Sequence, residues 1–213
     1  MIEIKKMTFN PFQENTYVLF DETKECVIID PGCYDKHEES LLLDFISSQG
    51  LKPVKLVNTH GHIDHVLGNY FVSEAYGIDL YAHANIVGQL AAIPNYSALY
   101  GFNAYKMSPQ PKQFLNEGDK LQFGNSELDI MFCPGHAPDH LVFYHAQQGF
   151  VINGDVLFQG SYGRVDLPGG DFSTLKDSII NKMFALPDDT VVYCGHGGET
   201  TIGHERHTNP INY

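Results

Sequence analysis

The segment THGHIDH at residues 59–65 constrains this chain more than any other feature. It places three histidines and one aspartate within six positions, directly after an apolar run: His60, His62, Asp64 and His65. Neutral imidazole is a good ligand for borderline divalent metals, and carboxylate oxygens add neutralising charge. Several imidazoles placed this close together are unfavourable for folding unless they serve a purpose such as binding a ligand. We therefore interpret the segment as one part of a metal site.

The spacing indicates how these side chains are presented. His60 and His62 follow the end of an expected strand at positions i and i+2, so both can point to the same side of an extended turn. Asp64 and His65 are expected to open a helix, where aspartate is also a good cap. The spacing differs from the i, i+4 pair of HExxH, so a helical metalloprotease site has no support. Further ligands must come from elsewhere in the chain.

Three further candidates stand at the ends of other expected strands. They are His136 in CPGHAPDH, Asp155 in INGDV and His196 in YCGHGG, and each is next to a glycine. A lone histidine at a strand end is more often an ordinary polar residue, but the cluster at 60–65 favours metal binding by the whole set. Seven ligands exceed the four of one tetrahedral site. Two adjacent metal ions are therefore the economical arrangement.

The hydrophobic pattern predicts an α/β (α+β) fold in a single domain over residues 1–213. Short strands open each half of the chain, and segments with helical spacing follow them at 35–50, 64–77, 84–91 and 171–187. Two such halves predict two mixed sheets packed face to face with helices outside. Residues 92–113 are rich in aromatics, proline and glycine without steady periodicity, which predicts a long surface loop.

Composition excludes several classes of function. The formal net charge is −13, from 26 acidic and 13 basic residues, so a nucleic-acid partner is not expected. The apolar runs are too short for a membrane span, and the N-terminus lacks the features of a secretory signal, so we expect a cytoplasmic protein. No obligate protein partner is expected. The four cysteines lack close pair spacing, which favours reduced thiols over disulfides or a thiolate site: Cys26, Cys33, Cys133 and Cys194.

The sequence resembles the metallo-β-lactamase superfamily. The hallmark HxHxDH stands as HGHIDH at 60–65, and the later ligands follow in the matching order over nearly the whole chain. The resemblance implies an αββα sandwich. It also implies that Asp155 bridges two ions, one held by His60, His62 and His136 and the other by Asp64, His65 and His196.

Within the superfamily, the resemblance favours the glyoxalase II branch. True β-lactamases lack an aspartate in the bridging place, so Asp155 favours the other hydrolases. GRVDLPGGD at 163–171 and GHGGETTIGHERHTNP at 195–210 are similar to segments of short bacterial glyoxalase II-like proteins. Full-length glyoxalase II has an additional C-terminal helical domain that supplies much of its glutathione site, whereas this chain ends soon after His196. Recognition of glutathione therefore stays open.

These inferences predict a binuclear metal-dependent hydrolase of a small-molecule thioester, acting through a metal-bridging hydroxide. Asp64 and Asp155 are the expected catalytic residues. Two zinc ions are preferred, and iron or manganese also suits the ligands. The alternative is a mononuclear iron persulfide dioxygenase whose ligands would be His60, His136 and Asp155. A non-catalytic metal-binding module and a ribonuclease are weaker alternatives, because the ligand set is complete and the chain is acidic.

Four further positions carry weaker signals. Asp30 in IIDPG is expected to orient a ligand histidine rather than only to form a turn before Pro31. Arg164 is expected either to meet an anionic substrate carboxylate or to form a buried structural pair with Asp166. For His140, a structural role is expected rather than a direct functional one. Four aromatic residues are expected to bury their own loop rather than to form a substrate lid: Tyr96, Tyr100, Phe102 and Tyr105.

Overall fold

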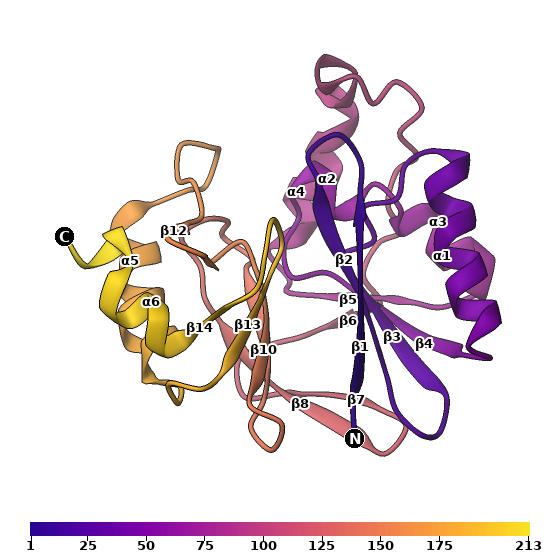
Figure 1. Cartoon of the computed structure of the whole chain (residues 1–213). Helices are drawn as coiled ribbons and strands as arrows, with labels where there is room; N and C mark the ends of the chain where they lie inside the picture. The colour runs from indigo at the N-terminus through magenta and orange to yellow at the C-terminus, as the bar shows by residue number, and fades with distance from the viewer. The chain divides into compact units, whose positions relative to one another are not determined.

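The computed structural model describes all residues from Met1 to Tyr213, and the chain divides into two compact units (Figure 1). Unit 1 comprises Met1–Leu115 and Gln122–Ser126, and unit 2 comprises Asn116–Leu121 and Glu127–Tyr213. Each unit has its own helices; unit 1 contains one sheet and unit 2 contains most of the other. The expected single domain over residues 1–213 stays a prediction.

Unit 1 has a six-stranded mixed sheet in the order β1-β2-β3-β4-β5-β6. Strands β1 to β3 pair antiparallel and β3 to β6 pair parallel. Every residue of β2 is buried, which places this strand inside the unit. The strand bounds are β1 Glu3–Phe9, β2 Glu14–Phe20, β3 Glu25–Ile29, β4 Lys52–Val57, β5 Leu80–Ala82 and β6 Gln113–Phe114.

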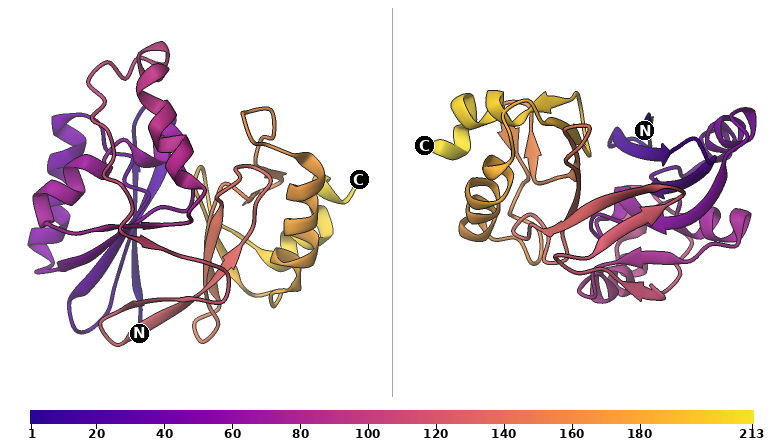
Figure 2. Two further views of the ribbon diagram at one scale, coloured as in Figure 1. Left: turned by 180° about the vertical axis from the view of Figure 1, so that it is seen from behind. Right: turned by 90° about the horizontal axis from the view of Figure 1, so that it is seen from below.

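The helices of unit 1 follow the predicted order. Helix α1 begins where the side chain of Asp35 accepts a hydrogen bond from the backbone of Glu38, and Gly50 follows its end at a φ of +62°. Figures 1 and 2 show α1 and α3 beside one another. The bounds are α1 Lys36–Ser48, α2 Ile63–Val66, α3 Asn69–Tyr76 and α4 Ile86–Ala92, followed by the 3₁₀ turns η1 Ile93–Asn95 and η2 Ser97–Tyr100.

The single helix predicted over residues 64–77 was wrong, because the chain forms α2 and α3 with a break between them. Gly68 lies at the break and donates its backbone N–H to the carbonyl of Pro31 at 2.7 Å. A Cβ atom at Gly68 would meet Cys33 Sγ at 2.6 Å. The close approach to residues 31–33 therefore sets the break. The loop predicted over 92–113 contains η1, η2 and the start of β6.

Unit 2 contains most of a second mixed sheet, in the order β14-β13-β10-β9-β8-β7. Strands β8, β9 and β10 pair antiparallel, whereas β10 and β13 pair parallel. The two mixed sheets with helices confirm the predicted fold class. The strand bounds are β7 Lys120–Phe123, β8 Ser126–Phe132, β9 Leu141–His145, β10 Phe150–Gly154, β13 Val191–Cys194 and β14 Thr200–Thr201.

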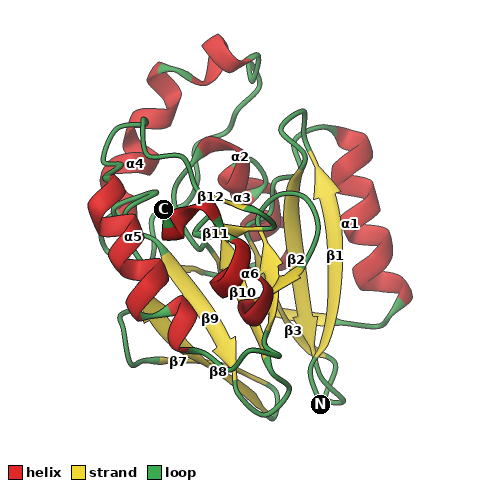
Figure 3. Cartoon of the chain, turned by 60° about the vertical axis from the view of Figure 1, so that its left-hand side comes forward, coloured by secondary structure: helices red, strands yellow, loops and turns green.

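The helices of unit 2, α5 Phe172–Asn181 and α6 Ile202–Thr208, share one core with its sheet (Figure 3). Leu175 and Ile202 belong to the same buried cluster as Val151 and Val192. Neither α6 nor the short hairpin of β11 Leu157–Phe158 and β12 Ser161–Tyr162 was predicted from the sequence. The 3₁₀ turns η3 Met183–Ala185 and η4 Pro210–Asn212 complete the unit. No helix in the chain combines the length and apolar character needed to cross a bilayer.

Candidate functional site

The four candidate ligands of unit 1 follow β4: His60 and His62 precede α2, and Asp64 and His65 lie within it. His60 and His65 are fully buried, whereas His62 and Asp64 are partly exposed. His62 is the N-cap residue of α2 and Asp64 lies in the first helical turn, so the expectation that Asp64 caps this helix was wrong.

These four side chains lie close together. The ring centroids of His60 and His62 are 4.7 Å apart, and those of His60 and His65 are 4.2 Å apart. Asp64 Oδ2 lies 3.8 Å from His65 Nε2. The structure thus brings together all the unit 1 residues that the sequence selected.

Asp30 orients two of these imidazoles. Its carboxylate accepts hydrogen bonds from Thr59 N at 2.7 Å and from Thr59 Oγ1 at 2.5 Å, and its Oδ2 lies 3.2 Å from His65 Nδ1. Thr59 Oγ1 donates to Asp30 and therefore accepts from His60 Nδ1, at 2.9 Å. Both imidazoles consequently carry their proton on Nδ1 and present the Nε2 lone pair as a ligand. The expected contact between Asp30 and a candidate ligand histidine is confirmed.

Asp30, His60 and His65 also offer ligand atoms that lie within 4.8 Å of one another. The hydrogen bonds already engage both carboxylate oxygens of Asp30. We therefore assign Asp30 the support of the imidazoles rather than a direct ligand role.

Glu14 is a buried acid that was not predicted from the sequence as part of the site. It lies on β2, and its Oε1 is 3.9 Å from His65 Nδ1. Burial raises the pKa of this carboxyl well above its usual value, although the nearby His65 acts in the opposite direction. A Cβ atom at Gly32 would lie 2.0 Å from Glu14 Oε2, so the glycine of IIDPG makes room for the acid. The available signal was an acidic residue at the start of a strand that ends in the hydrophobic run YVLF.

The three candidate ligands of unit 2 meet at Asp155, which follows β10 directly. Its Oδ2 lies 3.5 Å from His136 Nε2 and 3.4 Å from His196 Nε2. His136 Nδ1 is 2.7 Å from the backbone oxygen of Arg164 and donates to it, which leaves the Nε2 lone pair directed at Asp155. The structure thus joins three strand ends at one carboxylate.

Two neighbours fix the position of Asp155. His140 is buried, and its Nε2 accepts the backbone N–H of Asp155 at 3.0 Å, which confirms the structural role predicted for His140. Gly163 lies close to both Asp155 and His136. A Cβ atom at this position would lie 2.0 Å from the backbone carbonyl oxygen of Asp155 and 2.9 Å from the ring of His136. A side chain at position 163 would therefore displace candidate ligands.

Arg164 and Asp166 form a bidentate ion pair with two contacts of 2.7 Å. The side chains are 61% and 66% exposed, so the pair exists but the expectation that it is buried was wrong. The hydrogen bonds from Arg164 hold the pKa of Asp166 at about 2. Binding of a substrate carboxylate by Arg164 stays a prediction.

The cysteines do not contribute to either ligand group. All four are buried thiols outside any disulfide. Burial raises the pKa of Cys133 and of Cys194 to about 12, so both are neutral thiols near pH 7. The ligand chemistry is therefore that of imidazole and carboxylate alone.

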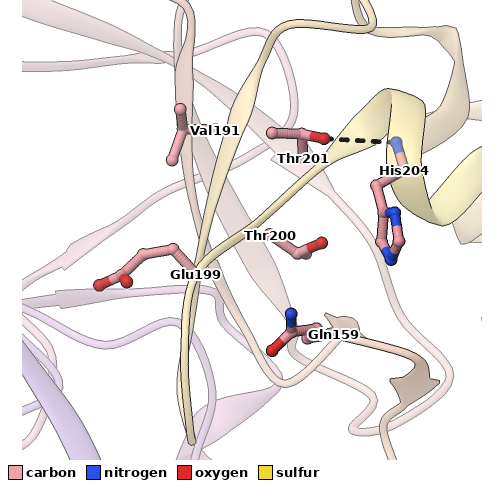
Figure 4. A pocket seen from close by; sticks show the side chains of 6 residues that line it. All are labelled: Gln159, Val191, Glu199, Thr200, Thr201 and His204. Atoms are coloured by element: carbon pink, nitrogen blue, oxygen red, sulfur yellow. Dashed lines mark hydrogen bonds between the residues drawn. The ribbon is translucent and has the colours of Figure 1, made fainter.

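Unit 2 also has a cavity of about 440 Å³ beside β14 and α6 (Figure 4). At its wall, Thr201 Oγ1 accepts a hydrogen bond from the backbone of His204 at 3.3 Å and caps α6. None of the seven predicted ligands lines this cavity. Its lining residues are Gln159, Val191, Glu199, Thr200, Thr201 and His204.

Three curated relatives match nearly the whole chain. "Probable metallo-hydrolase YqgX" of Bacillus subtilis is 38% identical over 209 residues, covering 97% of this chain and 96% of the relative. "Hydroxyacylglutathione hydrolase GloC" of Haemophilus influenzae is 34% identical over 211 residues, covering 99% and 97%. "Persulfide dioxygenase ETHE1, mitochondrial" of Mus musculus is 30% identical over 215 residues, covering 99% and 73%.

Solved structures share the fold. The crystal structure of the "BLEG-1 B3 metallo-beta-lactamase" has a TM-score of 0.88 and 34% identity, with 98% of each chain covered. That of TTHA1623 in a di-iron-bound form has a TM-score of 0.85 and 36% identity, covering 97% of this chain and 98% of the other. The model of the family "Metallo-beta-lactamase superfamily" matches residues 9–196. The chain therefore belongs to the metallo-β-lactamase superfamily.

Proposed function

We propose that this protein is a hydrolase of small-molecule thioesters that uses two adjacent divalent metal ions. The observation that carries the proposal is the position of Asp155 Oδ2, within 3.5 Å of His136 Nε2 and 3.4 Å of His196 Nε2. One carboxylate between two imidazole ligand atoms suits a bridge between two ions. The similarity to a hydroxyacylglutathione hydrolase over 99% of this chain supports the substrate class.

In this proposal, the ligands of unit 1 and unit 2 hold the same pair of ions. His60, His62 and His136 would hold one ion, Asp64, His65 and His196 would hold the other, and Asp155 would be shared between them. The donor set fits: it combines imidazole nitrogen with carboxylate oxygen, and the hydrogen bonds of His60, His65 and His136 direct Nε2 lone pairs outward. Zinc is the first choice, and the di-iron form of TTHA1623 supports iron as the second.

Two ions held by these residues would supply a water of lowered pKa and would polarise a substrate carbonyl. The residues of the chain do the rest. Asp30 and Thr59 keep His60 and His65 in the tautomer that coordinates, and we propose that the partly exposed carboxylate of Asp64 accepts the proton of the attacking water. A thiolate leaving group, whose conjugate acid has a pKa of about 8.5, departs without a strong general acid. The proposed site therefore needs no protein nucleophile.

The similarity to a persulfide dioxygenase at 30% identity favours one alternative, in which His60, His136 and Asp155 hold a single iron. This alternative predicts oxygen uptake with a persulfide. The B3 β-lactamase relative adds β-lactams to the substrates worth assaying. An amide nitrogen is a poorer leaving group than a thiolate and would need a proton donor.

The deciding experiment combines metal analysis with steady-state kinetics. Protein purified without added metal is assayed for metal per chain and then against S-lactoylglutathione, simple acyl thioesters, a cephalosporin and a persulfide. We expect nearly two ions per chain and thioester hydrolysis. One iron per chain with persulfide-dependent oxygen uptake would replace the proposal with the alternative. Metal-replete protein that turns over none of these substrates would contradict both.

A further inference from the structure

The hairpin of β11 and β12 adjoins all three candidate ligands of unit 2. Asp155 precedes β11 in the chain. The ring of Phe158 on β11 lies 6.2 Å from that of His196, centroid to centroid, with the two planes at 71°. Beyond β12, the backbone oxygen of Arg164 accepts the hydrogen bond from His136 Nδ1 at 2.7 Å. The position of this hairpin therefore affects how the candidate ligands are presented.

The tip of the hairpin is bound to α6 and to the residue after it (Figure 3). Phe158 pairs with Ser161, so the turn consists of residues 159–160, and Gly160 there has a φ angle of +66°. Gly160 donates its backbone N–H to Glu205 Oε2 on α6 at 3.0 Å. Asn209 Nδ2 donates to the backbone oxygen of Ser161 at 2.8 Å. Two side chains thus hold the turn and the strand that follows it.

Glu205 is a fully buried acid whose two carboxyl oxygens both accept hydrogen bonds. Besides the bond from Gly160 to Oε2, this oxygen accepts from Asn209 Nδ2 at 2.7 Å, and Oε1 accepts from Thr200 Oγ1 at 2.6 Å. Burial of a carboxyl group is unfavourable unless such bonds satisfy it. A satisfied buried polar network can rigidify one arrangement of the segments that it joins. Here it joins α6, β14 and the hairpin.

The base of the hairpin is fixed from the sheet. Asn153 on β10 donates through Nδ2 to the backbone oxygen of Leu157 at 2.6 Å and accepts the backbone N–H of Leu157 at 3.2 Å. Gly163 donates its backbone N–H to the oxygen of Val156 at 3.3 Å. The hairpin therefore has two supports, and only the tip depends on α6. Loss of the tip support would move the hairpin about its base.

We propose that Glu205 is a positioning residue for the metal ligands of unit 2. Its carboxyl group, together with Asn209, holds the hairpin so that Phe158 packs against His196 and the segment after β12 orients His136. The effect on catalysis rests on the proposed function, whereas the positioning of the two imidazoles does not depend on the substrate. This role also accounts for residues 200–209, which include none of the candidate metal ligands.

The test compares three variants of the full chain, each first examined by denaturant unfolding. Glu205→Met keeps the length of the side chain and removes both acceptors. Glu205→Gln is the conservative variant: its oxygen still accepts from Gly160 and Asn209, and its amide group donates to the hydroxyl of Thr200. Ile179→Ala creates a cavity in the core beneath α5 and is the matched control for general loss of stability.

Zinc affinity, measured by competition with a chelator, is the first quantity compared. We expect the affinity of Glu205→Met to fall about tenfold, at the lower end of the roughly 10–100-fold that supporting groups of a metal ligand contribute. Glu205→Gln and Ile179→Ala should each change it by less than about threefold. Restoration by glutamine would show that the hydrogen bonds matter, and the α5 variant separates this effect from a less stable fold.

The second readout is the imidazole NMR spectrum of protein labelled with ¹⁵N-histidine, recorded with and without zinc. In the wild type the Nδ1 proton of His136 is bound to the backbone oxygen of Arg164. We expect its signal to shift or to be lost through exchange with water in Glu205→Met. The signal should stay unchanged in Glu205→Gln and in Ile179→Ala.

These measurements keep the inference separate from the proposed function. If the wild type hydrolyses no thioester, the proposed function fails while zinc affinity and the His136 signal still report on Glu205. If Glu205→Met does not fold, Asn209→Ala, which removes the bond to Ser161, is judged by the same two readouts. Wild-type affinity with an unchanged His136 signal would overturn the inference. Equal losses in the tip variant and in Ile179→Ala would overturn it as well.

Discussion

The ligand groups of unit 1 and unit 2 are built in different ways. Unit 1 takes four candidate ligands from the six consecutive residues 60–65, which span the turn after β4 and the start of α2, whereas unit 2 takes three from separate strand ends. In unit 1 the imidazoles are oriented by side chains, Asp30 and Thr59. In unit 2 the orientation of His136 comes from a backbone oxygen, that of Arg164.

This difference determines which substitutions are expected to disturb each ligand group. A turn whose ligands are neighbours in sequence needs one buried carboxylate to set two imidazoles at once. Strand ends that converge from distant positions need backbones that can approach closely, which Gly163 permits. We therefore expect replacement of a supporting carboxylate to be most damaging in unit 1 and addition of side-chain volume to be most damaging in unit 2.

The largest effect is expected at the residue that joins the unit 2 ligands. Asp155→Asn removes the negative charge that faces both His136 and His196. We expect kcat/KM on a thioester to fall by more than the roughly 10–100-fold typical of a supporting residue, and metal content to drop. Metal analysis and steady-state kinetics measure both quantities. Asp166→Asn, at an exposed carboxylate of the same unit, should keep full metal content, and wild-type metal content in Asp155→Asn would be incompatible with a bridging role.

A smaller effect is expected from the supporting carboxylate of unit 1. Asp30→Asn retains the shape of the side chain but weakens acceptance from His65 and Thr59, so we expect metal affinity to fall about 10–100-fold. Competition with a chelator measures this affinity. Asp21→Asn is the matched control, because Asp21 is also buried and accepts hydrogen bonds from Thr23 and Ser126. Equal losses in the two variants would mean that general destabilisation, not imidazole orientation, explains the result.

Added volume at position 163 tests the backbone-based support of unit 2. A Cβ atom there would lie 2.0 Å from the backbone carbonyl oxygen of Asp155. Gly163→Ala should therefore lower the free energy of unfolding by about 1–3 kcal/mol, as overpacking does. Denaturant unfolding measures the change. Gly198→Ala is the control, since its Cβ atom would have only Gln159 Oε1 nearby, at 3.7 Å. Similar stability of the two variants would show that the 163 segment moves aside without cost.

The sequence predicted much of the fold because hydrophobic period and turn residues are local signals. It missed the break at Gly68, where a contact with Cys33 and Pro31, more than thirty positions earlier, decides where the helix stops. It missed α6, a seven-residue helix with a single capping threonine, Thr201. At Gly68 the deciding contact is tertiary, and at α6 the local signal is short.

The candidate ligands were accessible to sequence reasoning because the cluster at 60–65 is dense, and glycines beside strand ends drew attention to the other three. The supporting groups were harder to find. Thr59 lies inside the motif yet gave no signal, because its role depends on a hydroxyl that bonds Asp30 from another strand end. Glu14 comes from β2 and meets His65 only after folding. Roles that depend on distant contacts cannot be read from spacing.

The smallest predicted effect concerns the exposed ion pair between Arg164 and Asp166. The hydrogen bonds from Arg164 lower the pKa of Asp166 to about 2 in the folded protein. A carboxyl with a lowered pKa stabilises the fold above its unfolded pKa, and this contribution is lost as the pH falls towards 2. Asp166→Asn should therefore be slightly less stable than the wild type at pH 7, and denaturant unfolding should show the two converging between pH 4 and pH 2. High salt should shrink the difference at pH 7, because exposed charges are screened. A stability difference that persists at pH 2 would show that Asp166 acts through packing of the 163–171 segment. This segment would then help to position the unit 2 ligands at Asp166 as well as at Gly163.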